Sequence, residues 1–161
     1  MLQGEGIRDN IKKGLSWGGI PCSEIGRAGG SVSVVSDSCR TGVLVGRKGV
    51  RVEQLKKELQ AITGTECHLT LHEVKRPELE AKLVAEVVAE ALEKRMNFRR
   101  AIKRAIQTTM QSGAQGVKVE VAGRLGGAEM ARRNKEREGR VPLSTLQAHV
   151  DYGTARACTS Y

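Results

Sequence analysis

Apolar positions in the first half of the chain recur at both strand and helix spacings. They predict a short amphipathic helix over 7–15, two strands over 22–27 and 31–36 joined by a glycine pair, and a further strand over 67–74. A second helix is expected before that last strand. Its apolar residues recur every three or four positions ahead of a glycine that can end it: Val52, Leu55, Leu59, Ile62 and then Gly64.

The second half of the chain begins at a break over 75–77, where Pro77 suits the first turn of a helix. A stripe of apolar residues predicts that this helix runs to about Arg95. The same reasoning predicts the remaining elements: a helix over 98–111, strands over 117–122 and 145–152, and between the strands a glycine-rich, strongly basic connection over 123–140.

This order of elements predicts an α+β protein made of two small domains. The first domain is expected over 1–75 and the second over 76–161, which would place two helices on a short mixed or antiparallel sheet.

The charge of the chain narrows the class of partner. Its 161 residues include 27 Lys and Arg against 18 Asp and Glu, a formal charge of +9. Such an excess points to nucleic acid or an acidic membrane. A membrane partner is disfavoured, because no run of eighteen apolar residues occurs and no signal peptide opens the chain. Only four residues are aromatic, so RNA would be held by charge and backbone amides rather than by base stacking.

The sharpest local motif is a basic dipeptide between two glycines, Gly46-Arg47-Lys48-Gly49. Glycines let the backbone approach a phosphate closely, and the helix that follows turns its unpaired N–H groups toward the same anion. An isolated G-x-x-G is also typical of a plain turn. Here it lies between an apolar run over 41–45 and the amphipathic helix. With that run taken as a further helix, the order is helix-strand-strand-helix-helix-strand, which is the order of a type II KH domain that clamps an RNA backbone.

A second basic feature is the acid-free segment 94–104, which holds six cations on and before a predicted helix. Solvated helix faces usually mix the two signs of charge, so this segment favours a polyanion partner over a plain surface face. A third, weaker feature is the basic stretch 131–140.

Nothing in the sequence points to catalysis, a metal or another cofactor. The four cysteines are scattered without a C-x-x-C pair, and the three histidines form no helical ligand pair. We therefore expect reduced thiols and no enzymatic activity.

Seven blocks, in this order, carry a resemblance to a known family: GVLVGRKG at 42–49, VKRPEL at 74–79, LVAE at 83–86, FRRAIKRA at 98–105, GRLGGAEMA at 123–131, GRVPL at 139–143 and DYGT at 151–154. Together they resemble the bacterial-type third protein of the small ribosomal subunit, which contains a KH domain. Family members carry a longer leading segment and continue past Tyr161 into another strand. We therefore expect this chain to lack both terminal segments.

The resemblance implies a structural constituent of the small subunit that binds rRNA, lines the mRNA entry channel and assists mRNA unwinding. Its partners would be small-subunit rRNA, mRNA and neighbouring proteins of the subunit head, with no membrane. The implied RNA-binding residues of the KH loop are Gly46, Arg47, Lys48 and Gly49. Those implied at the mRNA entry are Arg99, Arg100, Lys103 and Arg104. Further implied RNA contacts are Arg124, Arg132, Arg133, Lys135 and Arg140.

The expected location is the ribosome of the cytoplasm, with an organellar ribosome left open. The alternative function is a free-standing KH-type RNA chaperone or regulator that acts off the ribosome. An enzyme acting on nucleic acid is a third and weaker possibility.

Overall fold

The computed structural model of the chain describes residues 19–21, 23–28, 31–46 and 49–160. The chain divides into two units, Met1–Lys75 and Arg76–Tyr161, called unit 1 and unit 2 below. The helix expected over 7–15 and the glycine pair at 29–30 lie outside the described residues.

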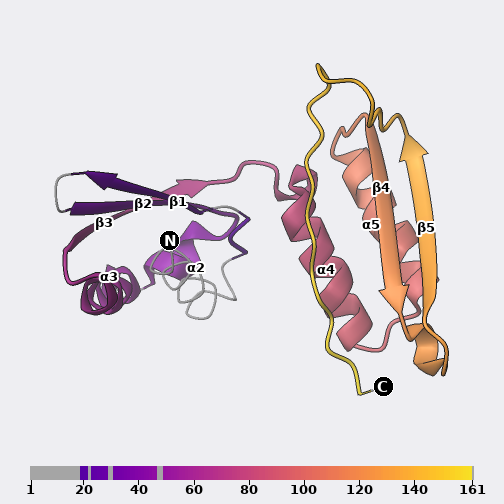
Figure 1. Cartoon of the computed structure of the whole chain (residues 1–161), viewed down its shortest axis with the longest axis horizontal. Coiled ribbons are helices and arrows are strands. Elements are labelled where there is room, and N and C mark those ends of the chain that lie inside the picture. The colour runs from indigo at the N-terminus through magenta and orange to yellow at the C-terminus, as the bar shows by residue number, and fades with distance from the viewer. Residues whose placement is uncertain (1–18, 22, 29–30, 47–48, 161) are drawn as a thin grey trace. The chain divides into compact units, whose positions relative to one another are not determined.

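Unit 1 contains a three-stranded sheet with β2 at its centre (Figure 1). Strand β1 (Ser23–Ala28) pairs with β2 (Ser31–Ser38) in antiparallel register, and β2 pairs with β3 (Glu66–Glu73) in parallel register. Parallel neighbours need a crossover, and two helices supply it: α2 (Thr41–Val45) and α3 (Val50–Thr63). The three strands and the long helix of this unit confirm the sequence prediction.

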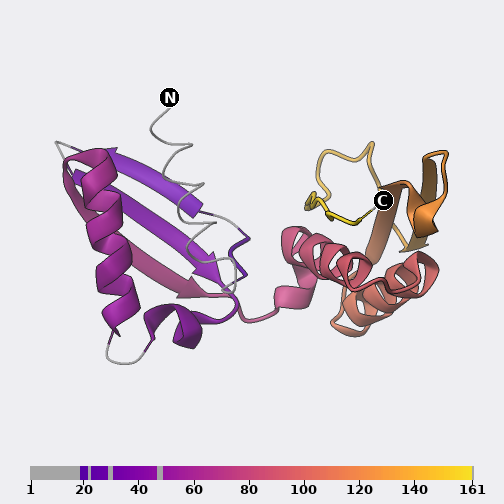
Figure 2. The same ribbon diagram turned by 90° about the horizontal axis from the view of Figure 1, so that it is seen from below.

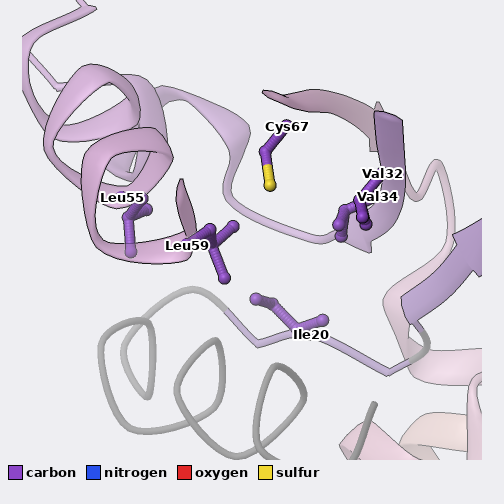
Figure 3. Close-up of a cluster of buried hydrophobic side chains, with 6 residues drawn as sticks. All are labelled: Ile20, Val32, Val34, Leu55, Leu59 and Cys67. Carbon is purple, nitrogen blue, oxygen red and sulfur yellow. The ribbon is translucent and has the colours of Figure 1, made fainter. Parts of the chain in front are cut away.

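The core of unit 1 lies between α3 and the sheet (Figure 3). Leu55 and Leu59 of α3 are buried against the strands, because they repeat on one face of the helix. They meet the inward-facing residues of the central strands, among them Val34 and Cys67. The helix ends where predicted, at Gly64, whose φ of +66° suits a residue without a Cβ.

Unit 2 packs two helices with a two-stranded antiparallel sheet (Figures 1 and 2). Its elements in chain order are the 3₁₀ turn η3 (Pro77–Leu79), α4 (Ala81–Glu93), α5 (Phe98–Gln111), β4 (Gly116–Gly123), the short turn η4 (Leu125–Gly127) and β5 (Arg132–Gly139). Helix α5 contacts both α4 and the strands. Its Ile102 is fully buried in an apolar cluster with Val88 of α4 and Val121 of β4.

The structure corrects three predictions for unit 2. The helix expected to begin with Pro77 in its first turn and to run to about Arg95 spans Ala81–Glu93, because Glu80 is extended after a single 3₁₀ turn. The strand expected over 145–152 is absent, since no strand or helix lies in 140–160. Instead β5 occupies 132–139, inside the segment predicted to be a connection. It has no apolar alternation, and its pairing along all of β4 defines it as a strand.

The end of the chain follows α4 instead of joining the sheet (Figure 1). The backbone N–H of Ala81 donates to Asp151 Oδ2 at 2.7 Å, and Lys82 Nζ donates to the carbonyl oxygen of Thr154. Further along the helix, the N–H of Cys158 donates to Glu93 Oε1 at 3.0 Å. Because Glu80 makes no side-chain cap, Asp151 caps α4 from a distant part of the chain.

Candidate nucleic-acid interface

The glycine pair of the predicted loop joins two helices. Gly46 ends α2 with a φ of +68°, and Gly49 precedes α3 with a φ of +78°. Both values lie in the left-handed region, which explains the choice of glycine at each position. At Gly46 a Cβ would also come within 3.2 Å of the Arg51 side chain. Arg47 and Lys48 lie between these glycines and outside the described residues.

Gly49 of this loop is also the residue that precedes the first turn of α3. Gly49 has no side chain to accept from the first N–H groups of this 14-residue helix. The positive end of the helix dipole at this point favours an anionic ligand. Backbone geometry and the loop's basic residues thus favour the same kind of ligand.

Helix α5 carries the second group of predicted residues, in agreement with the expected bounds of 98–111. Its start is fixed by Asn97, whose Oδ1 accepts from the N–H of Arg99 at 3.0 Å. One side of the helix is buried: Ala101, Ile102, Ala105, Ile106 and Thr109. The other side exposes four cations, Arg99, Arg100, Lys103 and Arg104, which we call the α5 cation cluster.

The α5 cation cluster is unfavourable for the helix itself. Arg99 and Arg100 lie in the first turn, at the positive end of the dipole, and no acidic residue accompanies them there. Arg100 and Arg104 are also four residues apart, as are Arg99 and Lys103, so like charges face each other along the helix. The phosphates of a polyanionic ligand would neutralise these charges.

One member of the cluster rests on an aromatic ring. The Arg99 guanidinium lies 5.7 Å from the centroid of the Phe98 ring. Phe98 itself packs against the core of unit 2. This cation–π contact limits where the Arg99 side chain can lie at the start of α5.

The turn between α4 and α5 contains a backbone conformation that is rare for arginine. Arg95 has a φ of +57°. Its N–H donates to the carbonyl of Leu92, and the N–H of Met96 donates to that of Ala91. These two bonds form a Schellman motif, in which glycine is the usual residue at this position. The Arg95 guanidinium also donates to Ser160 Oγ at 3.3 Å.

The remaining predicted RNA contacts are spread over the β4–β5 hairpin and its ends. Arg124 braces the η4 turn, because its Nε donates to the carbonyl of Ala128 at 3.0 Å. Arg132 is exposed where β5 begins. Arg140 closes the other end of the hairpin, where its N–H donates to the carbonyl of Gln115 at 3.1 Å.

Two of the predicted residues share one carboxylate on the sheet. Arg133 Nε lies 3.1 Å from Glu120 Oε1, and Lys135 Nζ lies 3.4 Å from Glu120 Oε2. Lys118 and Arg137 are also exposed and lie directly opposite each other in the hairpin, although neither was predicted as an RNA contact. The alternation of cations along 133–137 is the signal that could have identified Arg137.

Other kinds of site find no support in the described part of the chain. There, no group of three or more His, Cys, Asp or Glu side chains could hold a metal ion. The helices found among those same residues are also too short or too polar to cross a membrane.

Comparison with known proteins gives two family matches that together cover most of the chain. Residues 6–79 match the model of the KH domain. Residues 88–161 match the model described as ribosomal protein S3, C-terminal domain. The predicted KH domain and the α+β fold class are thereby confirmed.

Individual relatives are similar over almost the entire chain. The small ribosomal subunit protein uS3 of Desulfatibacillum aliphaticivorans is 52% identical over 155 residues, which is 96% of this chain and 71% of the relative. That of Thermodesulfovibrio yellowstonii is 50% identical over 155 residues, 96% of this chain and 72% of the relative. That of Maridesulfovibrio salexigens is 45% identical over all 161 residues, 76% of the relative.

Proposed function

This chain belongs to the family of small ribosomal subunit protein uS3, and we propose that it binds rRNA and grips mRNA where the messenger enters the subunit. It is a ribosomal, RNA-binding protein and not an enzyme. The proposal goes further, because it assigns RNA contacts to particular residues and a place on the ribosome to unit 2. The cytoplasmic ribosome is its proposed location.

The observation that carries the proposal is the α5 cation cluster. Four exposed cations occupy the first two turns of a helix whose opposite side is buried, so they project from a fixed backbone. Helix α5 contains no carboxylate that would compete with phosphates for these cations. Such a row grips a single strand through its backbone without reading its sequence, and it would favour opened over paired mRNA.

The KH loop supplies the proposed rRNA contact of unit 1. Gly46 and Gly49 adopt the left-handed backbone conformation, and the sequence between them supplies two cations, Arg47 and Lys48. Replacing both cations, Arg47→Asp with Lys48→Asp, should weaken RNA binding and leave the fold unchanged. Circular dichroism checks the fold, and an unfolded double variant would show that the loop serves structure instead.

Salt dependence of RNA affinity tests the α5 assignment. In a single-stranded complex, each phosphate contact adds roughly 0.7 to the slope of log K against log salt. The double variant Arg100→Gln with Lys103→Gln should therefore flatten the slope by roughly 1.4. A slope equal to that of the parent chain would refute a role for these two residues.

Sucrose-gradient sedimentation separates the ribosomal function from a KH-type chaperone acting off the ribosome. We expect the tagged full chain to migrate with small subunits. A pool found only at the top of the gradient would instead support the free-standing alternative.

A further inference from the structure

We infer that unit 2 has a second RNA-backbone site on the face of the β4–β5 hairpin opposite α5. The inference extends the proposed function, because it gives unit 2 two RNA-binding faces in place of one. The site consists of the residues that point away from α5 along both strands, called the outer sheet face: Lys118, Glu120, Ala122, Arg133, Lys135 and Arg137.

The strand register separates the two faces. Val117, Val119 and Val121 pack into the core with α5. Because side chains alternate along a strand, Lys118, Glu120 and Ala122 project from the opposite face. Directly paired residues share a face in an antiparallel sheet. The register therefore adds the partners of those three, which are Arg137, Lys135 and Arg133.

The charges of β5 are sorted by face. Arg133, Lys135 and Arg137 all lie on the outer face, whereas Asn134, Glu136 and Glu138 pair with the core-facing valines of β4. The outer sheet face therefore holds four cations and one carboxylate, a net charge of three positive units. All six of its residues are exposed.

The pairing on this face leaves cations without an internal counter-charge. Lys118 and Arg137 are direct cross-strand partners, an arrangement that destabilises a hairpin. Neither forms an ion pair with a described residue. Glu120, with its side chain 34% exposed, is the single carboxylate and holds both Arg133 and Lys135. It keeps those two cations extended side by side on the sheet.

The chemistry of the face fits a sugar-phosphate backbone. Cations at every second position of β5 form a straight row that a strand of phosphates can follow. The face has no aromatic side chain on which a base could stack, so the contact is independent of sequence. RNA could then lie on the outer sheet face while a different segment lies along α5.

The test measures the salt dependence of binding of the full chain to a single-stranded RNA oligonucleotide long enough to reach both faces. The outer-face variant is Lys118→Gln with Arg137→Gln, and it should flatten the slope by roughly 1.4. Its control removes two exposed cations of unit 2 that lie on neither face, Arg76→Gln with Arg156→Gln. The inference is overturned if the outer-face variant and the control give the same slope.

A second variant keeps the test decisive if loss of the cations disturbs the sheet. Glu120→Gln removes the carboxylate that competes with phosphates for Arg133 and Lys135, so it should steepen the slope and raise the affinity. Glu78→Gln, an exposed acid of unit 2 away from the hairpin, is the matched control. Equal effects of the two variants would contradict the site.

Other outcomes identify other functions for the face. Self-association of the outer-face variant with unchanged RNA binding would mean that the cations only protect an edge strand. Capture by anionic phospholipid vesicles in preference to RNA, lost in the same variant, would mean a membrane surface. A flattened slope for Arg100→Gln with Lys103→Gln but not for the outer-face variant would leave the proposed function intact and remove only this inference. The reverse result would remove the α5 assignment and keep the outer site.

Discussion

Removing one charge from the α5 cation cluster should change the stability of unit 2 and its affinity for RNA in opposite directions. Arg100 lies in the first turn of α5, where the helix dipole opposes a positive charge, and it faces Arg104 one turn later. Replacing Arg100 by Gln removes both repulsions, while the intrinsic helix propensity of the two residues is nearly equal. The variant should be more stable and should bind RNA less tightly.

The size of the gain follows from two contributions. Relief at the dipole contributes about 0.3–1 kcal/mol, and relief of the like-charge pair contributes about 0.2–0.5 kcal/mol. Together they stabilise unit 2 by roughly 0.5–1.5 kcal/mol at low salt. For a unit of this size, a change of about 1 kcal/mol shifts the melting temperature by roughly 4–8 °C.

Native-state hydrogen exchange measures this gain within unit 2 alone. The amides of Ile102 and Ile106 lie on the buried side of α5, so their slowest exchange reports the unfolding of this unit. The control is Arg104→Gln, which relieves the like-charge pair but lies beyond the first turn. It should gain only about 0.2–0.5 kcal/mol. Both gains should shrink at 1 M salt, where the Debye length is about 3 Å.

Two results would refute this reasoning. If Arg100→Gln exchanges faster than the parent chain, the arginine stabilises the helix through a contact that outweighs its charge. If Arg100→Gln gains stability without losing RNA affinity, the unfavourable charge has a cause other than RNA.

Three further changes test the packing of unit 2. Ile102→Ala should destabilise it by about 2–5 kcal/mol through a cavity in a fully buried site, seen in hydrogen exchange of α5 with unit 1 amides unaffected. Gly153→Ala should loosen residues 151–160, because its Cβ would lie 2.4 Å from Lys82 N; we expect a loss of about 1–3 kcal/mol in urea unfolding, and parent-like stability would contradict the contact. Arg95→Gly should relieve a strained left-handed residue by about 1 kcal/mol, and a clear loss of stability would show that its bond to Ser160 matters more.

Helix α5 could be predicted to its end residues because its apolar residues keep one face over four turns. The Asn97 cap at its start was found only in the structure. The long helix of unit 1 was predictable for the same kind of reason, since Gly64 ends an apolar stripe. Local periodicity was sufficient in both cases.

Strand β5 could not be predicted in this way, because its stability comes from its partner. Its sequence, RRNKEREG, contains no apolar residue, and the register with β4 and the ion pairs of Glu120 hold it in place. The segment 145–152 was wrongly predicted to be a strand, because its local pattern suggested one that no partner strand stabilises. It has apolar residues at strand spacing, yet its Asp151 serves α4 and no strand pairs with it. Tertiary pairing decided both segments.

The basic residues were easier to predict as a class than as an arrangement. Charge and family resemblance pointed to Arg133 and Lys135, but only the register shows that Lys118 and Arg137 join them on one face. In the glycine loop, the G-x-x-G motif indicated the residue types, and the structure adds that Gly46 and Gly49 both have positive φ angles.

Helix α4 is synthesised before the residue that caps it. The carboxylate that accepts from Ala81 belongs to Asp151, which lies 70 residues further along the chain. During synthesis the amino-terminal part of a chain emerges and folds first, so α4 leaves the exit tunnel well before its cap exists. The described core and helix ends of unit 1 use only residues within its first 75 positions. Unit 1 can therefore mature on the nascent chain while unit 2 waits, and a chain interrupted before Asp151 would carry a finished first unit with α4 still uncapped.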